Sequence, residues 1–226
     1  MRISKDGDIR KQEFLDTAFE LFCKKGYENT SINNIIDKIG VSKGAFYYYF
    51  KSKEEVLDQL SLQQTKKLIN NIKKIVEDDQ LNALEKLNQI TANSLKYKAE
   101  HREHRKKIYK IFEQVTNAKL QQRILKNNVE YIQPIIQSII EQGIQEGFFN
   151  TSFPEETAEI YIYLGYILRN MLNRHLEKIE KEPENIEIIK KKLLFYENLI
   201  ERIFGVKNGS VKITKTLKKY FIGNKG

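Results

Sequence analysis

Residues 18–57 read AFELFCKKGYENTSINNIIDKIGVSKGAFYYYFKSKEEVL, and two glycines divide this stretch into three segments with helical patterns. The first segment is apolar at helical spacing and ends in two lysines before Gly26, which is typical of a helix C-terminus. The second segment, 32–39, ends at Gly40, and the third covers 43–49. Three helices whose last two members are joined by a tight turn containing glycine describe a helix-turn-helix.

The third predicted helix has one face for the core and one face for DNA. In a helix-turn-helix this helix enters the major groove. Phe46 and Phe50 are one turn apart and should pack inward. A lysine can donate to guanine, tyrosine hydroxyls can bond phosphate, and small residues permit close approach to the bases. We therefore expect DNA contacts from the remaining residues of this helix: Lys43, Gly44, Ala45, Tyr47, Tyr48 and Tyr49.

Three predicted helix N-termini cluster in the same stretch, and such ends bind phosphate through free N–H groups. Thr30 and Ser31 precede the second helix, and Ser42 caps the third. Ser52 opens a fourth helix with a capping box, and Lys53 adds positive charge there. These side chains complete the predicted DNA-binding set.

The stretch from Arg10 to Leu57 resembles the DNA-binding domain of TetR-family bacterial repressors, most specifically in the run GVSKG…YYYFKSKEE. Tyr49 stands where relatives often carry histidine, so base preference could differ. The resemblance implies an all-helical homodimer whose C-terminal domain binds a small-molecule inducer. The chain is accordingly interpreted as a ligand-responsive transcriptional regulator, acting as a repressor on a palindromic DNA operator and released by that inducer.

The composition also favours an all-α fold. The 226 residues include only 11 Gly and 3 Pro, too few for the many tight turns of a sandwich or barrel. Long helices are predicted after the helix-turn-helix, and Pro134 either kinks one of them or marks a break near Asn128. We expect three segments: a DNA-binding domain over 1–52, a helical ligand-binding and dimerisation domain over 53–205, and a basic tail over 206–226.

The net charge of +9 is concentrated at the two ends of the chain. Segment 54–205 holds equal numbers of basic and acidic residues, whereas 206–226 holds lysines and no acidic residue. Such ends suggest contact with a polyanion, but sign alone does not separate nucleic acid from a membrane surface. For the tail we favour the interpretation in which its apolar residues, beginning at Val211, dock on the preceding domain while its lysines stay solvated.

Two apolar stripes at helical spacing predict a homodimer interface, in which two helices from each copy form a four-helix bundle. The stripes consist of Tyr161, Leu164, Gly165, Leu168 and Leu172 on one helix, and Leu193, Tyr196, Ile200 and Ile203 on the next. Aromatic residues of the central helices are the candidates for lining an inducer pocket: Tyr97, Tyr109, Phe112, Tyr131 and Tyr166.

The chain offers little support for catalysis, a cofactor or a metal. It has no Gly-rich phosphate loop and no nucleophile motif, and a carboxylate-bridged metal enzyme would need Glu-x-x-His pairs that are absent. His101 and His104 are spaced to share a helix face, for which a solvated surface is favoured over a metal site. The competing class is a helical ligand-binding or adaptor protein of the same fold that no longer reads DNA.

The single cysteine, Cys23, cannot form an internal disulfide, and we expect it to pack in the core rather than to sense redox state. The charged N-terminus has no apolar signal-peptide core. No stretch approaches the roughly 18 uncharged apolar residues of a membrane span. These features predict a cytoplasmic protein.

Overall fold

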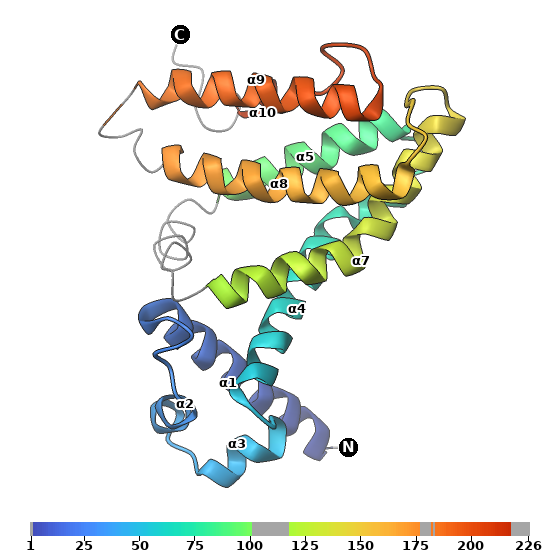
Figure 1. Ribbon diagram of the computed structural model, residues 1–226. Coiled ribbons are helices and arrows are strands. Elements are labelled where there is room, and N and C mark those ends of the chain that lie inside the picture. The colour runs from blue at the N-terminus through green and yellow to red at the C-terminus, as the bar shows by residue number, and fades with distance from the viewer. Residues whose placement is uncertain (1, 101–117, 177–181, 183, 218–226) are drawn as a thin grey trace. The chain divides into compact units, whose positions relative to one another are not determined.

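The computed structural model describes residues 2–100, 118–176, 182 and 184–217 (Figure 1). Within these residues the secondary structure is helical and contains no strand, so the predicted all-α fold is confirmed. The helices are α1 (Arg2–Lys25), α2 (Ile32–Ile39), α3 (Lys43–Tyr49), α4 (Lys53–Val76), α5 (Ala83–Glu100), α7 (Ala118–Gln145), α8 (Pro154–Leu176), α9 (Asn185–Phe204) and α10 (Ile213–Leu217). No helix in the described ranges is both long enough and apolar enough to cross a membrane.

Helix α2 has the boundaries that its capping residues predict. The Ser31 hydroxyl accepts a hydrogen bond from the Asn34 N–H, and the Asn34 side chain accepts one from the Ser31 N–H. At the other end Gly40 has φ of 79°, a left-handed conformation that glycine adopts without steric cost. Its N–H donates to the Ile36 carbonyl at 2.8 Å and closes the helix.

The chain divides into two compact units. Among the described residues, the first unit contains 2–66 and 118–127, and the second contains 67–100, 128–176, 182 and 184–217. This division follows packing; the functional division into 1–52, 53–205 and 206–226 stays a prediction.

The core of the first unit is rich in aromatic residues. Phe14, Phe22, Phe46 and Phe50 are all buried in it, as are apolar residues from α4 and from the first turns of α7. Aromatic rings in edge-to-face contact fill such a core and fix the orientation of short helices that have little packing area of their own. The three helices of the predicted helix-turn-helix are thereby held together.

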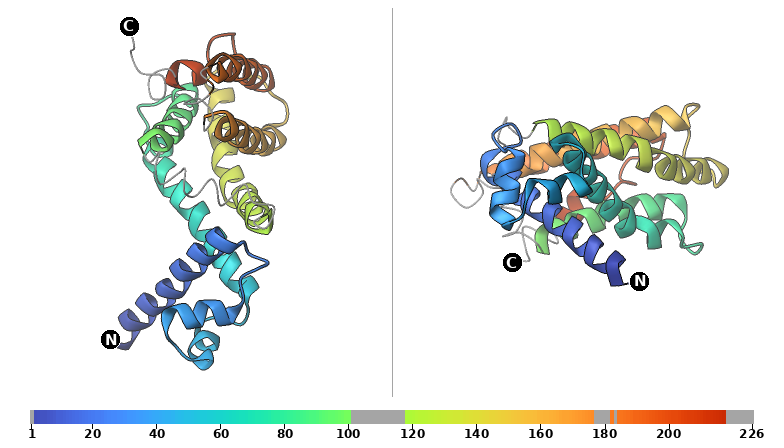
Figure 2. Two further views of the ribbon diagram at one scale, coloured as in Figure 1. Left: turned by 90° about the vertical axis from the view of Figure 1, so that its left-hand side faces the viewer. Right: turned by 90° about the horizontal axis from the view of Figure 1, so that it is seen from below.

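The second unit is built from long helices around an aliphatic core. Helices α8 and α9 lie side by side, and α10 packs against α5 and α9 (Figure 2). Lys86, buried on α5, donates to the Val76 carbonyl at the end of α4 and to the Gln142 side chain of α7. Helix α7 continues through Pro134, so of the two alternatives left open by the sequence, the break near Asn128 is excluded.

The described part of the tail docks on the second unit. Val211 and Ile213 are buried in its core, whereas Lys212 and Lys215 are exposed. The backbone N–H of Val211 donates to the buried carboxylate of Glu201 at 3.0 Å. For these residues the predicted docking is confirmed.

Candidate nucleic-acid interface

Helix α3 presents two tyrosines to solvent and two phenylalanines to the core. Tyr47 and Tyr48 are 48% and 79% exposed, whereas Phe46 and Phe50 are buried. The Phe46 ring meets the Phe14 ring edge-on, with 5.7 Å between the centroids, which holds α3 against α1. The predicted division of α3 into an inner and an outer face is confirmed.

The other α3 residues differ in exposure. Lys43 and Gly44 are exposed, and Lys43 Nζ lies 6.0 Å from the centroid of the Tyr47 ring. Ala45 and Tyr49 are half-buried and pack against the aromatic core. The accessible part of the predicted DNA surface is therefore the first turn of α3 with its two exposed tyrosines. Contact of this surface with DNA stays a prediction.

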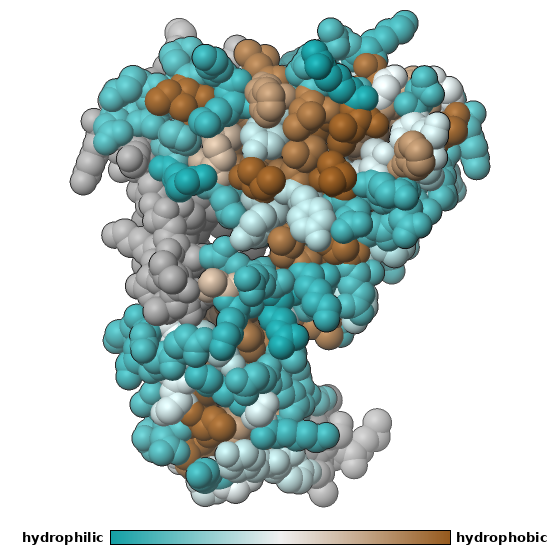
Figure 3. Space-filling model, in the orientation of Figure 1, coloured by the Kyte–Doolittle hydropathy of each residue, from teal (hydrophilic) through white to brown (hydrophobic). Residues whose placement is uncertain are grey.

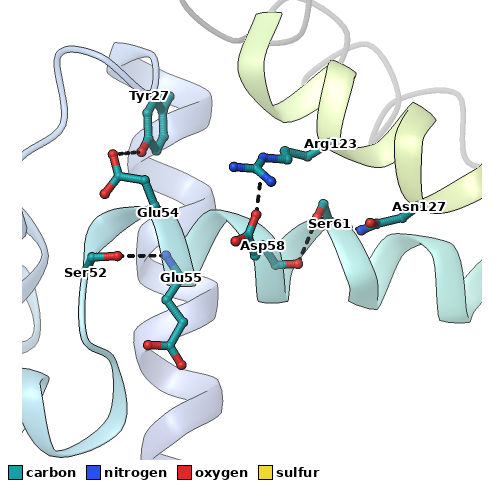
Figure 4. Close-up of polar contacts among 8 residues, drawn as sticks. All are labelled: Tyr27, Ser52, Glu54, Glu55, Asp58, Ser61, Arg123 and Asn127. Carbon is teal, nitrogen blue, oxygen red and sulfur yellow. Dashed lines mark hydrogen bonds and ion pairs between the residues drawn. The ribbon is translucent and has the colours of Figure 1, made fainter. Parts of the chain in front are cut away.

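The predicted N-terminal caps of α3 and α4 are formed. The Ser42 hydroxyl accepts from the Ala45 N–H at 3.3 Å, and the Ser52 hydroxyl accepts from the Glu55 N–H at 3.1 Å (Figure 4). Ser31, the cap of α2, is exposed. The first N–H groups of a capped helix still lack intrahelical partners, so these three ends retain the capacity to bind phosphate.

Thr30 requires a correction. Its side chain is only 1% exposed, and its hydroxyl donates to the Gly26 carbonyl at 2.8 Å. The hydroxyl therefore stabilises the turn between α1 and α2, and it is not available to DNA. The sequence pattern could not distinguish this buried threonine from the exposed cap residue beside it.

Lys53 holds the same turn from α4. Its Nζ donates to the carbonyls of Tyr27 and Thr30, both at 2.9 Å, and lies 4.2 Å from the centroid of the Tyr27 ring. The Tyr27 hydroxyl in turn donates to Glu54 at 2.9 Å (Figure 4). That hydrogen bond lowers the pKa of Glu54, while burial raises the pKa of Tyr27. Contact of Lys53 with phosphate stays a prediction, but its contact with the turn is a role that sequence reasoning missed.

The candidate ligand-binding aromatics are only partly described. Tyr109 and Phe112 lie outside the described residues, and the side chain of Tyr97 does too. Tyr131 on α7 is exposed, and Tyr166 on α8 is half-buried beneath the Arg169 guanidinium, which lies 5.1 Å from its ring centroid. A pocket lined by these aromatic residues stays a prediction.

The structure describes the candidate redox residue, Cys23, but not the two histidines considered as metal ligands. His101 and His104 lie outside the described residues, and within the described part of the chain no three His, Cys, Asp or Glu side chains cluster as metal ligands would. Cys23 is buried, and burial together with Glu20 raises the pKa of its thiol to about 12. A thiol that stays protonated at neutral pH is a poor nucleophile, so the packing role is confirmed.

The predicted dimer stripes require the largest correction. Most of their residues fill the core of their own protomer and cannot form a surface for a second copy; these are Leu168, Leu172, Leu193, Tyr196 and Ile200. Tyr161, Leu164 and Ile203 are half-buried against the same core, and only Gly165 is exposed. A helix that packs both on its own protomer and on a second copy has two apolar sides. Periodicity alone does not show which of them faces the core of its own protomer.

In comparisons with known proteins, the chain matches two family models. Residues 14–60 match the model for bacterial regulatory proteins of the tetR family, and residues 97–198 match a tetracyclin repressor-like C-terminal domain. The first match covers the helix-turn-helix and the start of α4. The second covers much of the second unit.

Individual relatives agree with these models. The HTH-type transcriptional regulator YerO of Bacillus subtilis is 41% identical over 69 residues, a match that spans 30% of this chain and only 24% of that protein. The HTH-type transcriptional repressor KstR2 of Mycobacterium tuberculosis is 27% identical over 66% of this chain and 73% of its own. A TetR-family regulator structure from Syntrophomonas wolfei superposes with a TM-score of 0.60 at 25% identity, covering 85% of this chain and 95% of that one.

Proposed function

The chain belongs to the TetR family of bacterial transcriptional regulators, and from that premise we propose that it is a repressor that binds a palindromic DNA operator as a homodimer and is released by a small-molecule inducer. It acts in the cytoplasm, where bacterial DNA lies. The observation that carries the proposal is the outer face of α3, where exposed lysine and tyrosine side chains flank a glycine.

That face suits the major groove on chemical grounds. Lys43 can donate to O6 or N7 of guanine, and the hydroxyls of Tyr47 and Tyr48 can bond phosphate. The buried phenylalanines behind them fix the helix, so these side chains are presented from a rigid support. The capped N-termini of α2, α3 and α4 add sites for the phosphate backbone on either side.

The dimer is proposed to form through other sides of α8 and α9 than those that the sequence pattern selected. Apolar side chains gather over these two helices (Figure 3), and the exposed ones are Ile160, Tyr163, Ile167, Ile188, Leu194 and Phe195. A contiguous apolar surface of this kind is typical of an interface with another protein. A second copy can cover it by a two-fold axis, which yields the four-helix bundle expected from the family.

A gel shift with DNA from upstream of the protein's own gene tests the proposal. We expect sequence-specific retention that survives competitor DNA, and a complex whose stoichiometry is two chains per operator. The adaptor alternative instead predicts a folded, ligand-binding protein with no preference for any DNA sequence. Lys43→Ala should relax base preference and cost about 1–3 kcal/mol of operator binding if the lysine contacts a base.

A further inference from the structure

The first turns of α7 fold as part of the unit that contains the helix-turn-helix. Leu120 and Ile124 are buried in the same aromatic core as Phe14 and Phe46, although more than 70 residues separate them from α3. The rest of α7, from residue 128, belongs to the second unit. Among the described helices, only α4 and α7 have residues in both units.

Polar contacts join this part of α7 to α4 (Figure 4). Arg123 Nε lies 3.3 Å from Asp58 Oδ1, and the Asn127 side-chain amide donates to the Ser61 hydroxyl at 2.9 Å. Asp58 and Ser61 are three residues apart on α4 and face the same neighbour. The Ser61 side chain is fully buried, and its hydroxyl also donates to the Asp58 carbonyl.

A third contact reaches the turn between α1 and α2 directly. Lys119 Nζ lies 2.6 Å from Glu28 and 5.4 Å from the centroid of the Tyr27 ring. Helix α4 also holds this turn, because Lys53 Nζ donates to two of its backbone carbonyls. The turn leads straight into Ser31, the cap of α2. The position of α2 therefore depends on contacts from both α4 and α7.

We propose that residues 118–127 are a positioning element of the DNA-binding unit, in which Arg123 and Asn127 hold the first turns of α4 and thereby set the position of the turn before α2. This inference rests on the proposed DNA-binding function. The Arg123–Asp58 pair is partly exposed, and exposed ion pairs are weak, so the contact can be remade while the apolar core stays intact.

Hydrogen exchange of the full chain tests the positioning directly. Arg123→Gln is expected to speed amide exchange about fivefold or more at residues 27–31 and in the first turns of α4, since local opening there becomes easier. The matched control is Lys73→Gln, which breaks an exposed ion pair in the second unit between Lys73 on α4 and Glu77 just after that helix. Unchanged exchange at 27–31 in both Arg123→Gln and a double variant with Asn127→Ala would overturn the inference.

Operator affinity separates positioning from direct contact with DNA. Arg123→Asp should weaken binding about tenfold, and adding Asp58→Arg should restore it to within about threefold, because the swapped pair re-forms the contact. Arg123→Gln should leave the salt dependence of binding unchanged. A slope lower by about one unit would instead make Arg123 a phosphate contact and contradict a positioning role. If the wild-type chain bound no DNA, the proposed function would fail, and the exchange experiment would still decide whether 118–127 hold the turn.

Discussion

Gly44 lies in the first turn of α3, where nothing in the protein requires a glycine. A Cβ built there would meet only the Ser42 hydroxyl, at 3.8 Å, which is ordinary contact. Gly44→Ala should therefore leave the fold intact and, through better helix propensity, raise the free energy of unfolding by about 0.5–1 kcal/mol. The same methyl group would stand between the helix and the bases, so operator binding should weaken by about 1–3 kcal/mol.

Thermal unfolding and gel shifts of the same preparation measure both effects. Gly165→Ala provides the control, because Gly165 is also a helical glycine with open space around it, on α8 of the second unit. It should gain stability without losing DNA affinity. Full operator affinity in Gly44→Ala would remove the first turn of α3 from the DNA contact.

Lys53 is expected to matter for stability as well as for any phosphate contact. In Lys53→Met the carbonyls of Tyr27 and Thr30 lose their donor while the apolar stem is kept. The free energy of unfolding should fall by about 1–3 kcal/mol, as it does when a partly buried acceptor is left unsatisfied. Urea denaturation measures the loss, and Lys51→Met, at an exposed neighbouring lysine, should change it little. Equal stability of the two variants would show that the turn does not need this ammonium group.

At the scale of single elements, the docked tail can be tested at Thr214. Its N–H and hydroxyl donate to the two oxygens of the Glu197 carboxylate, at 2.6 and 2.8 Å. Thr214→Val keeps the shape of the side chain and removes one donor from a buried carboxylate. We expect a loss of about 1–2 kcal/mol of unfolding free energy, with operator affinity within about threefold, or 0.6 kcal/mol.

The exposed Lys215→Ala serves as the control for this variant and should change neither quantity. A tenfold loss of operator affinity in Thr214→Val would place the tail in DNA binding instead.

The helix boundaries around the helix-turn-helix were predictable because their signals are local. A serine cap and a glycine stop each act within about four residues of a helix end. Helix α2 has both of these signals, and α3 has the predicted serine cap. The contacts of Lys53 and Arg123 were not predictable, since each joins residues far apart in sequence and neither pair forms a motif. The same limit explains Thr30, whose burial depends on how α1 and α2 are joined.

For α8 and α9 the spacing of apolar residues predicted apolar stripes. It did not show whether the protomer's own core or a second copy buries them. Leu168 and Leu193 belong to the predicted stripes, and both pack in the protomer's own core. The outer apolar residues of α8, Ile160, Tyr163 and Ile167, are also at helical spacing but were not selected. When a helix has two apolar sides, the sequence pattern does not show which side faces the protomer's own core. Only the packing of the folded chain distinguishes them.

At the scale of the whole molecule, the dimer can be tested with a pair of matched variants. Phe195 on α9 and Phe153, which precedes α8, are 64% and 65% exposed, so a charge at either position should leave the protomer folded. Phe195→Arg should give a monomer at micromolar concentration, because a buried unpaired charge disrupts an apolar interface. Phe153→Arg, outside the α8–α9 surface, should remain a dimer.

Sedimentation velocity measures the oligomeric state, and far-UV circular dichroism checks that both variants are folded. The buried Leu168 cannot serve in this test, since Leu168→Arg would unfold the protomer itself. A stable wild-type monomer, or a dimer unaffected by Phe195→Arg, would place the interface elsewhere.

DNA recognition by α3 can be measured by footprinting of the DNA upstream of the protein's own gene. We expect two protected half-sites related by a dyad, with centres about 10 base pairs or a multiple of that apart, as two recognition helices of one dimer require. Protection should be lost in the double variant Tyr47→Ala and Tyr48→Ala, which removes two exposed side chains of α3 and keeps its buried phenylalanines. Protection that is absent in the wild type, or that persists unchanged in this variant, would contradict DNA recognition by α3.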